Sequence, residues 1–162
     1  MKLKYLSTAA ILATFATFQA AHANTDTGSL GVQVNVQANC SLSGAAMDFG
    51  SYISGQSTDL TAEGSITYAN CPAGTLTFEL ASGQSNDVAN RFMTDGSGQE
   101  QLSYQLYRTV TRNAVWGVGN DAQSVQLFAS GGGSLIVYGT IPANQSVSSG
   151  TFTDTVAMTL TF

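Results

Sequence analysis

Large or apolar side chains alternate with threonines along the final segment of the chain, Thr151–Phe162. One set of alternate positions carries Phe152, Asp154, Val156, Met158, Leu160 and Phe162; the other carries five threonines and one alanine. A period of two predicts a β-strand that lays one face on a core. A sheet that ends on such a strand must pair or cover its edge. The pattern therefore predicts an open sheet edge here.

A second alternating segment lies before Cys40 and places Leu30, Val32, Val34 and Val36 on one face of a predicted strand over Ser29–Ala38. One sequence thus combines an open edge with a loose strand, which suggests a subunit built to polymerise. The pattern alone is equally compatible with an ordinary first strand of a closed sandwich.

Further short alternating runs predict a β-rich fold, and no long stretch has the helical period. The predicted strands are Asp48–Ile53, Gly64–Cys71, Thr75–Ala81, Gln101–Thr109, Ser124–Phe128 and Ser134–Ile141. Two core faces are expected, one from Leu76, Phe78 and Leu80 and one from Leu102, Tyr104 and Leu106, with Tyr107 opposite the second. Turns are predicted at Ser82-Gly83, Asp95-Gly96, Gly119-Asn120-Asp121 and Gly131-Gly132-Gly133. Short strands at this spacing indicate an all-β sandwich or barrel.

The first 23 residues have the form of a signal peptide. Lys2 and Lys4 precede an apolar run over Tyr5–Phe18, and Ala21-His22-Ala23 fits a cleavage site after Ala23. A retained membrane anchor is the alternative. It is disfavoured because the run is short and no later stretch approaches the roughly 20 apolar residues that a membrane-spanning helix needs.

The remaining chain is acidic. It keeps three basic residues, Arg91, Arg108 and Arg112, against ten acidic ones, a net charge of −7. A nucleic-acid partner would require a basic stripe, and an anionic membrane surface would repel such a chain. Neither class of partner is expected.

The chain has two cysteines, Cys40 and Cys71. An even count in an exported chain favours a disulfide. Two sulfurs without a histidine cannot complete a four-ligand zinc site, so the metal alternative is weak.

Candidate catalytic sets are largely missing, and we expect no enzyme activity, cofactor or metal. The histidine and both lysines lie within the predicted signal peptide, which leaves Ser-His-Asp, Cys-His and Ser-Lys mechanisms without a base. The glycine-rich run Gly117–Ala122 lacks a following helix, and Asp95–Glu100 fails the calcium-loop pattern; both are interpreted as turns. No carboxylate pair for glycoside hydrolysis is singled out. Trp116 is interpreted as a core or edge aromatic rather than a ligand platform.

Several stretches together resemble the spore coat U domain, the fold of subunits in archaic (Csu-type) chaperone–usher pili. They lie in the family's order and cover essentially the whole of residues 24–162. The stretches are Asn39-Cys40, Met47–Tyr52, Ile66–Cys71, Leu102–Arg108, Val115–Gly117, Tyr138–Ala143 and Gly150–Val156. One departure is Phe152, where the family usually has tyrosine.

The resemblance implies an incomplete immunoglobulin-like sandwich that lacks its last strand and is completed by donor-strand complementation. A signal peptide (1–23) would precede an arm (24–39) and a pilin domain (40–162), with Thr27–Ala38 as the donor strand. The donor side chains would be Leu30, Val32, Val34 and Val36, and the acceptor groove would be lined partly by Val156, Met158, Leu160 and Phe162. Such strand addition is a known binding mode.

The expected function is that of a structural pilus subunit at the cell surface, in attachment and biofilm formation. The implied partners are a periplasmic chaperone, an outer-membrane usher and neighbouring subunits. An exported carbohydrate- or surface-binding module, or a spore or cyst coat protein, are the alternatives. An isolated subunit is expected to be marginally stable, prone to aggregation or self-pairing.

Overall fold

The computed structural model describes residues 26–162, so the predicted signal peptide lies outside the described residues. The chain divides into two units, Met1–Asn35 and Val36–Phe162. All regular elements of the described residues belong to the second unit. The strands are β1 (Ser41–Gly44), β2 (Leu60–Cys71), β3 (Gly74–Leu80), β4 (Phe92–Thr94), β5 (Gln101–Ser103), β6 (Gln105–Tyr107), β7 (Gln123–Leu127), β8 (Gly131–Ile141) and β9 (Met158–Thr161), with short 3₁₀ helices η1 (Gly83–Ser85) and η2 (Gly119–Asp121).

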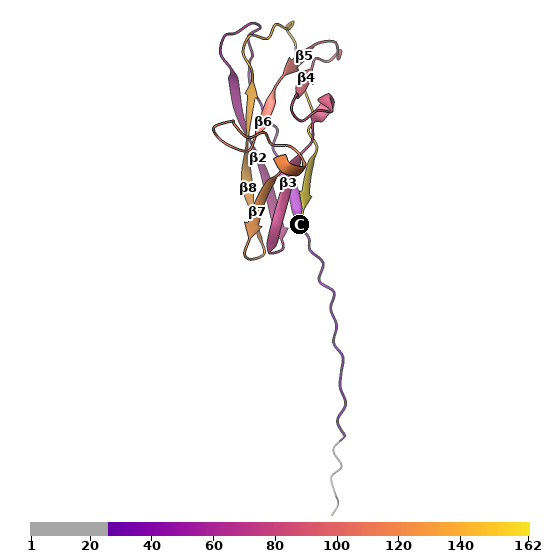
Figure 1. Cartoon of the computed structure of the whole chain (residues 1–162). Helices are drawn as coiled ribbons and strands as arrows, with labels where there is room; N and C mark the ends of the chain where they lie inside the picture. The colour runs from indigo at the N-terminus through magenta and orange to yellow at the C-terminus, as the bar shows by residue number, and fades with distance from the viewer. Residues whose placement is uncertain (1–25) are drawn as a thin grey trace, which may run out of the picture. The chain divides into compact units, whose positions relative to one another are not determined.

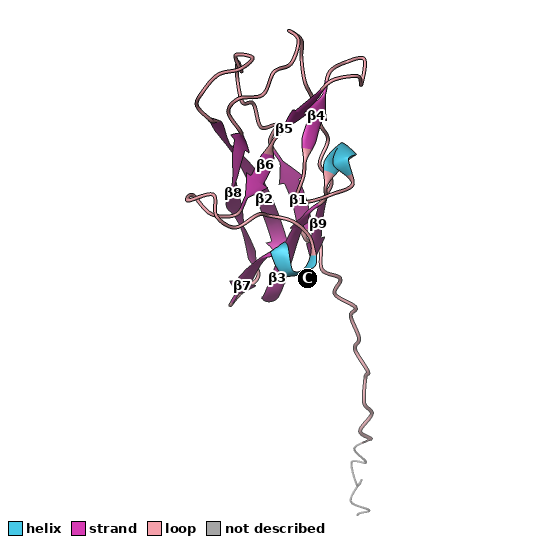
Figure 2. Cartoon of the chain, turned by 45° about the horizontal axis from the view of Figure 1, so that its top comes forward, coloured by secondary structure: helices cyan, strands magenta, loops and turns pink. Residues whose placement is uncertain are grey.

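The strands form two main antiparallel sheets and one small hairpin. The first sheet has the order β1-β2-β8-β6 and the second the order β7-β3-β9, while β4 pairs with β5. Figures 1 and 2 show the strands running along the length of this unit, with the β4–β5 hairpin near one end. The prediction of an all-β, immunoglobulin-like sandwich is confirmed, and the sheets do not close on each other.

The core lies between the two sheets, where both predicted apolar faces are found. Leu76, Phe78 and Leu80 of β3 are buried, as are the side chains of Leu102, Tyr104 and Leu106. Trp116 is only 1% exposed, and its indole N–H donates to the carbonyl oxygen of Phe78 at 2.9 Å. Trp116 is thus a core aromatic, in agreement with its interpretation from the sequence.

Among residues 26–162, Arg91 is the one buried charged side chain, at 1% exposed. Its guanidinium donates to the carbonyl oxygens of Leu80, Ala81 and Trp116 and to the side-chain oxygen of Gln105, over distances of 2.6 to 3.1 Å. A buried arginine is tolerated where its donors are satisfied in this way. Burial lowers the pKa of the guanidinium from its ordinary value. Arg91 therefore ties the loop before β4 to three other parts of the sandwich.

Two local predictions within the sandwich were wrong. Asp48–Ile53 is not a strand, because the carboxylate of Asp48 accepts from the backbone N–H of Gly50 at 2.8 Å and Gly50 has a positive φ of 74°. Gly131–Gly133 is not a turn but the start of β8. A Cβ at Gly132 would lie 2.3 Å from the carbonyl oxygen of Tyr68. The glycines thus serve a close approach of two strands beside an irregularity in the β2–β8 pairing.

The predicted strand Gln101–Thr109 is divided in two. β5 pairs with β4 and β6 pairs with β8, and at the change of partner the Tyr104 N–H donates to the carbonyl oxygen of Arg91. β1 and β4 were not predicted, since each is too short to display an alternating pattern.

Candidate functional site

Two sheet edges of the sandwich are open along the same side. β1 is hydrogen-bonded only to β2 and ends the first sheet; β9 is hydrogen-bonded only to β3 and ends the second. No strand of residues 26–162 lies between β1 and β9. Each edge therefore presents backbone N–H and C=O groups that a further strand could pair.

A groove of about 500 Å³ lies between these edges. One wall is formed by the end of β1 and the chain after it, and the other by residues 152–158. Core side chains such as Ile66, Leu106 and Val137 form its floor, and the remaining lining includes Gly44, Met47, Phe49, Met93, Tyr104, Phe152, Val156 and Met158. The lining is largely apolar, so the groove suits an apolar strand better than a charged ligand.

The wall formed by residues 152–158 is held by its backbone from one side. Thr153 and Thr94 exchange two backbone hydrogen bonds of 2.9 and 3.1 Å, and the Ala81 N–H donates to the carbonyl oxygen of Ala157 at 2.9 Å. The predicted strand Thr151–Phe162 is regular only over β9, because its neighbour β3 ends at Leu80 and the chain then turns into η1. The predicted alternation nevertheless persists, with Phe152, Val156 and Met158 half-buried and the threonines exposed.

Asp154 fastens this wall to the rest of the domain. The Tyr104 O–H donates to its carboxylate at 2.6 Å, and the backbone N–H of Gln84 donates to it at 3.0 Å. Burial, together with the hydrogen bond to Asp154, raises the pKa of the Tyr104 phenol above its ordinary value. Gly83 makes room for the carboxylate: its φ is +68°, and a Cβ there would lie 2.0 Å from an Asp154 oxygen.

The opposite wall owes its position to the loop after β1. Met47 and Phe49 are half-buried and extend across the first sheet. A Cβ at Gly139 of β8 would lie 2.5 Å from the Met47 sulfur and 2.6 Å from the Phe49 ring. Phe49 also meets Tyr104 edge to face, with 6.3 Å between ring centroids.

The four groove residues predicted from the sequence occupy three kinds of position. Val156 and Met158 line the groove. Leu160 packs against the core beside β3, and Phe162 is 54% exposed. Gly44, Met47 and Met93 were not predicted as groove residues, because none of them lies in an alternating segment. Only the resemblance, through Met47–Tyr52, pointed to that part of the chain.

The arm has no regular secondary structure, so the predicted strand over Ser29–Ala38 is absent. Leu30, Val32, Val34 and Val36 are 81 to 88% exposed. An alternating pattern supplies one apolar face, but a strand also needs a neighbour for its backbone hydrogen bonds, and none is described for these residues. The donor role of these four side chains stays a prediction.

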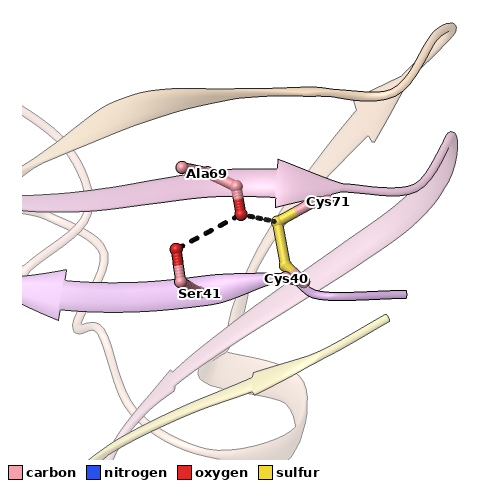
Figure 3. The surroundings of a disulfide bond; sticks show 4 residues. All are labelled: Cys40, Ser41, Ala69 and Cys71. Carbon is pink, nitrogen blue, oxygen red and sulfur yellow. Dashed lines mark hydrogen bonds between the residues drawn. A yellow bond between two sulfur atoms is a disulfide. The ribbon is translucent and has the colours of Figure 1, made fainter. Parts of the chain in front are cut away.

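A disulfide joins Cys40 and Cys71, as expected from the sequence. It links the residue before β1 to the last residue of β2, and beside it the Ser41 hydroxyl donates to the Ala69 carbonyl (Figure 3). The bond thus fixes the free edge strand that forms one side of the groove.

The other candidate sites of the sequence are turns. The carboxylate of Asp95 accepts from the backbone N–H groups of Gln99 and Glu100, and residues 119–121 form η2. Hydrogen bonds of Asp95, first with Ser97 and then with Glu100, lower the pKa of its carboxyl. Within residues 26–162 there is no cluster of three histidine, cysteine or acidic side chains suited to a metal ion. Nor does any described helix have the length and apolarity needed to cross a membrane.

Comparison with known families identifies the fold. The Spore Coat Protein U domain matches residues 26–159. The chain belongs to this family. The spore coat U match includes most of the arm as well as the sandwich. Protein U of Myxococcus xanthus is 33% identical to this chain over 168 residues. The alignment covers 93% of this chain and 92% of Protein U.

Two solved structures that match this chain are complexes of a chaperone with a tip subunit. One is the CsuC–CsuE chaperone–tip adhesion subunit pre-assembly complex from archaic chaperone–usher Csu pili of Acinetobacter baumannii, with a TM-score of 0.54 and 21% identity. The match covers 76% of this spore coat U chain but only 40% of the matched chain. A chaperone–tip adhesin complex of CFA/I fimbriae has a TM-score of 0.47 and 12% identity, covering 76% and 42% of the two chains. The first likeness supports the immunoglobulin-like fold.

Proposed function

We propose that this chain is a structural subunit of a chaperone–usher surface fibre, which polymerises when the arm of one copy enters the groove of the next. The observation that carries this proposal is the open, apolar groove between β1 and residues 152–158. The arm offers the complementary shape, an extended segment with four exposed aliphatic side chains at alternate positions. Donor residues are Leu30, Val32, Val34 and Val36, and Val156 and Met158 contribute to the acceptor.

Physical complementarity favours a strand as the occupant. A strand between β1 and β9 would pair the free backbone groups of one edge, and every second side chain would point into the groove. Each buried valine or leucine contributes roughly 1.5 to 3 kcal/mol. Residues 24–39 then form a donor arm and residues 40–162 the acceptor domain, and the role is structural rather than catalytic.

The partners and location follow from this assembly. A subunit with an unfilled groove would need a periplasmic chaperone to cover it and an outer-membrane usher to exchange that cover for the next arm. The signal peptide would direct export and would be cleaved after Ala23. The product would be a fibre on the cell surface that serves attachment and biofilm formation. The fold likeness to the Csu chaperone–subunit complex supports the chaperone as a partner.

Filling the groove within one molecule tests the proposal. The parent chain is residues 24–162. In the variant, a second copy of the segment Thr27–Ala38 is appended after Phe162 through a flexible linker. Thermal unfolding and gel filtration are recorded for both chains. We expect a monomer whose Tm rises by about 10 °C or more, because a bound strand stabilises the domain by several kcal/mol.

The matched control carries the same extension with its four aliphatic side chains replaced by serine. It should behave like the parent, which separates groove filling from a general effect of the linker. A parent that is already a stable monomer, with no gain from the extension, would contradict the proposal.

A resting-cell coat is the second candidate function. The identity with Protein U over nearly its whole length, and the family's description as a spore coat domain, favour it. The same strand exchange would build such a coat. Immunogold labelling of growing and dormant cells distinguishes the two, since a fibre subunit is expected on growing cells and a coat protein only around dormant ones.

A further inference from the structure

All methionines of the described residues line the groove. The sequence has four, of which one is Met1; the other three, Met47, Met93 and Met158, come from three distant parts of the chain and converge on this single surface. Methionine is unbranched and flexible, so it fills irregular spaces and recurs on surfaces that bind more than one partner.

Two of these methionines face glycines. A Cβ at Gly44 of β1 would lie 2.7 Å from the terminal methyl of Met158, which therefore extends from β9 to the opposite edge. Met47 approaches Gly64 and Gly139 of the first sheet in the same way, at 3.2 and 2.5 Å from the position of a Cβ. The glycines leave notches, and in this structure methionine side chains occupy them. Met93 is not among the nearest neighbours of a Cβ placed at any glycine.

We propose that Met47 and Met158 set the specificity of the groove, as flexible fillers that move within the glycine notches to admit donor side chains of different size. This inference rests on the proposed function. In that function one groove receives strands from two sources, first a chaperone and then the arm of another copy. The arm alone carries both leucine and valine. A rigid groove would bind a side chain of one size and exclude larger ones, since adding a single methylene to a close-packed site costs free energy.

Leucine provides the contrast, because it has nearly the volume of methionine but is branched and adopts fewer conformations. The double substitution Met47→Leu and Met158→Leu removes the flexibility while keeping the groove apolar. Leu127→Met is the matched control, since it makes a leucine–methionine exchange at a half-buried position of β7 that does not line the groove.

The binding experiment uses residues 24–162 with the four aliphatic donor residues replaced by serine, so that the chain's own arm does not compete. Peptides of Thr27–Ala38 carry valine, leucine or phenylalanine at position 34, and their Kd values are measured by fluorescence anisotropy. We expect the unchanged groove and the Leu127→Met control to bind all three within about threefold. The double leucine variant should keep the valine peptide and lose tenfold or more for the phenylalanine peptide.

Methionine oxidation gives a second readout. Hydrogen peroxide transfers one oxygen atom to the thioether sulfur, which becomes a sulfoxide, and the peroxide is reduced to water. Mass spectrometry of proteolytic fragments of the domain then reports how accessible each methionine is. A bound donor peptide should slow oxidation at Met47 and Met158 severalfold.

The outcomes separate this inference from the proposed function. If no peptide binds or protects the methionines in any variant, the proposed function fails. If all peptides bind and the double variant discriminates no more than the control, the groove is a strand site but its methionines do not set specificity. If the double variant does not fold, the Kd values of the unsubstituted groove test the inference. Near-equal Kd values for the three peptides support it, and a tenfold weaker Kd for the phenylalanine peptide overturns it.

Discussion

At the residue scale, single polar groups hold the groove in shape. Asp154 is a polar residue in an otherwise apolar alternating set, and its carboxylate accepts hydrogen bonds from Tyr104 and from the turn at Gln84. Arg91 has a similar role inside the sandwich, where it donates to carbonyl groups rather than to a carboxylate. Both depend on partners distant in sequence, so their roles follow from tertiary contacts.

Tyr104 should make stability depend on alkaline pH. A tyrosine ionises near its ordinary value of 10.0 in the unfolded chain, whereas burial and Asp154 raise its pKa in the fold. The folded state then holds the proton more tightly, so this contribution is complete below pH 10 and is lost as the pH rises above it. The free energy of unfolding should fall by up to roughly 1 kcal/mol per pH unit there.

Urea unfolding between pH 8 and 11.5 measures this effect, with Tyr104→Phe for comparison and the half-buried Tyr107→Phe as control. The decline above pH 10 should be shallower in Tyr104→Phe and unchanged in Tyr107→Phe. Equal slopes in all three chains would mean that Tyr104 is not the responsible group.

At the element scale, two segments with the same alternation have different structures. β9 is a strand because β3 pairs with it, whereas the arm lacks a described neighbour and remains irregular. The short edge strand β1 has a different support. It is four residues long, and the disulfide at its start ties it to the end of β2. This covalent link makes so short an edge strand a durable wall of the groove.

Loss of the disulfide should therefore weaken the domain strongly. The bridge closes a loop with a sequence separation of 31, for which the chain-entropy model gives roughly 3 to 4 kcal/mol. We expect the double variant Cys40→Ser, Cys71→Ser to lose about this much in urea unfolding. The reduced chain with its native cysteines should lose a similar amount.

Reductant should have no effect on the double-serine variant, which serves as the control. An unchanged midpoint, or disulfide-linked dimers of the native chain on a non-reducing gel, would argue against a stabilising bridge within one chain.

At the scale of the whole molecule, residues 26–162 combine a groove between two open sheet edges with an arm that has no strand partner, and under the proposed function this combination makes the fold an assembly unit. In the proposed function, the arm of one copy fills the groove of the next copy. This arrangement predicts that arm and groove can be disabled separately, which an ordinary first strand of a closed sandwich would not allow.

Val34→Asp should disable the arm alone. An aspartate in the groove loses the burial of valine, worth roughly 1.5 kcal/mol or more, and adds an unpaired charge, so arm binding should weaken at least tenfold. Electron microscopy should show no fibres from this chain, while co-purification should show chaperone binding intact. Asn35→Asp is the control, since it adds the same charge at the neighbouring outward position.

Fibres of normal length from Val34→Asp would exclude Val34 as a donor side chain. Loss of chaperone binding in the same variant would indicate a damaged fold rather than a disabled arm.

Local pattern and composition were enough to predict several features of this protein. The apolar faces of β3 and of residues 102–106 followed from periodicity. The interpretation of Trp116 as a core or edge aromatic followed from residue type, and the disulfide from an even cysteine count in a chain predicted to be exported. The all-β class followed from the repeated short runs. Each of these depends on residues close together in the chain or on the redox environment.

Which sheet edges stay open, and which residues line the groove between them, depends on the tertiary fold. The groove joins Gly44, Met47, Met93 and Met158, whose spacing carries no period. Likewise Gly131–Gly133 became a strand because Tyr68 lies close beside it, and Thr151–Phe162 was shortened because β3 ends early. Strand formation depends on a neighbour's backbone as much as on the segment's own side chains, and that neighbour is set by the fold.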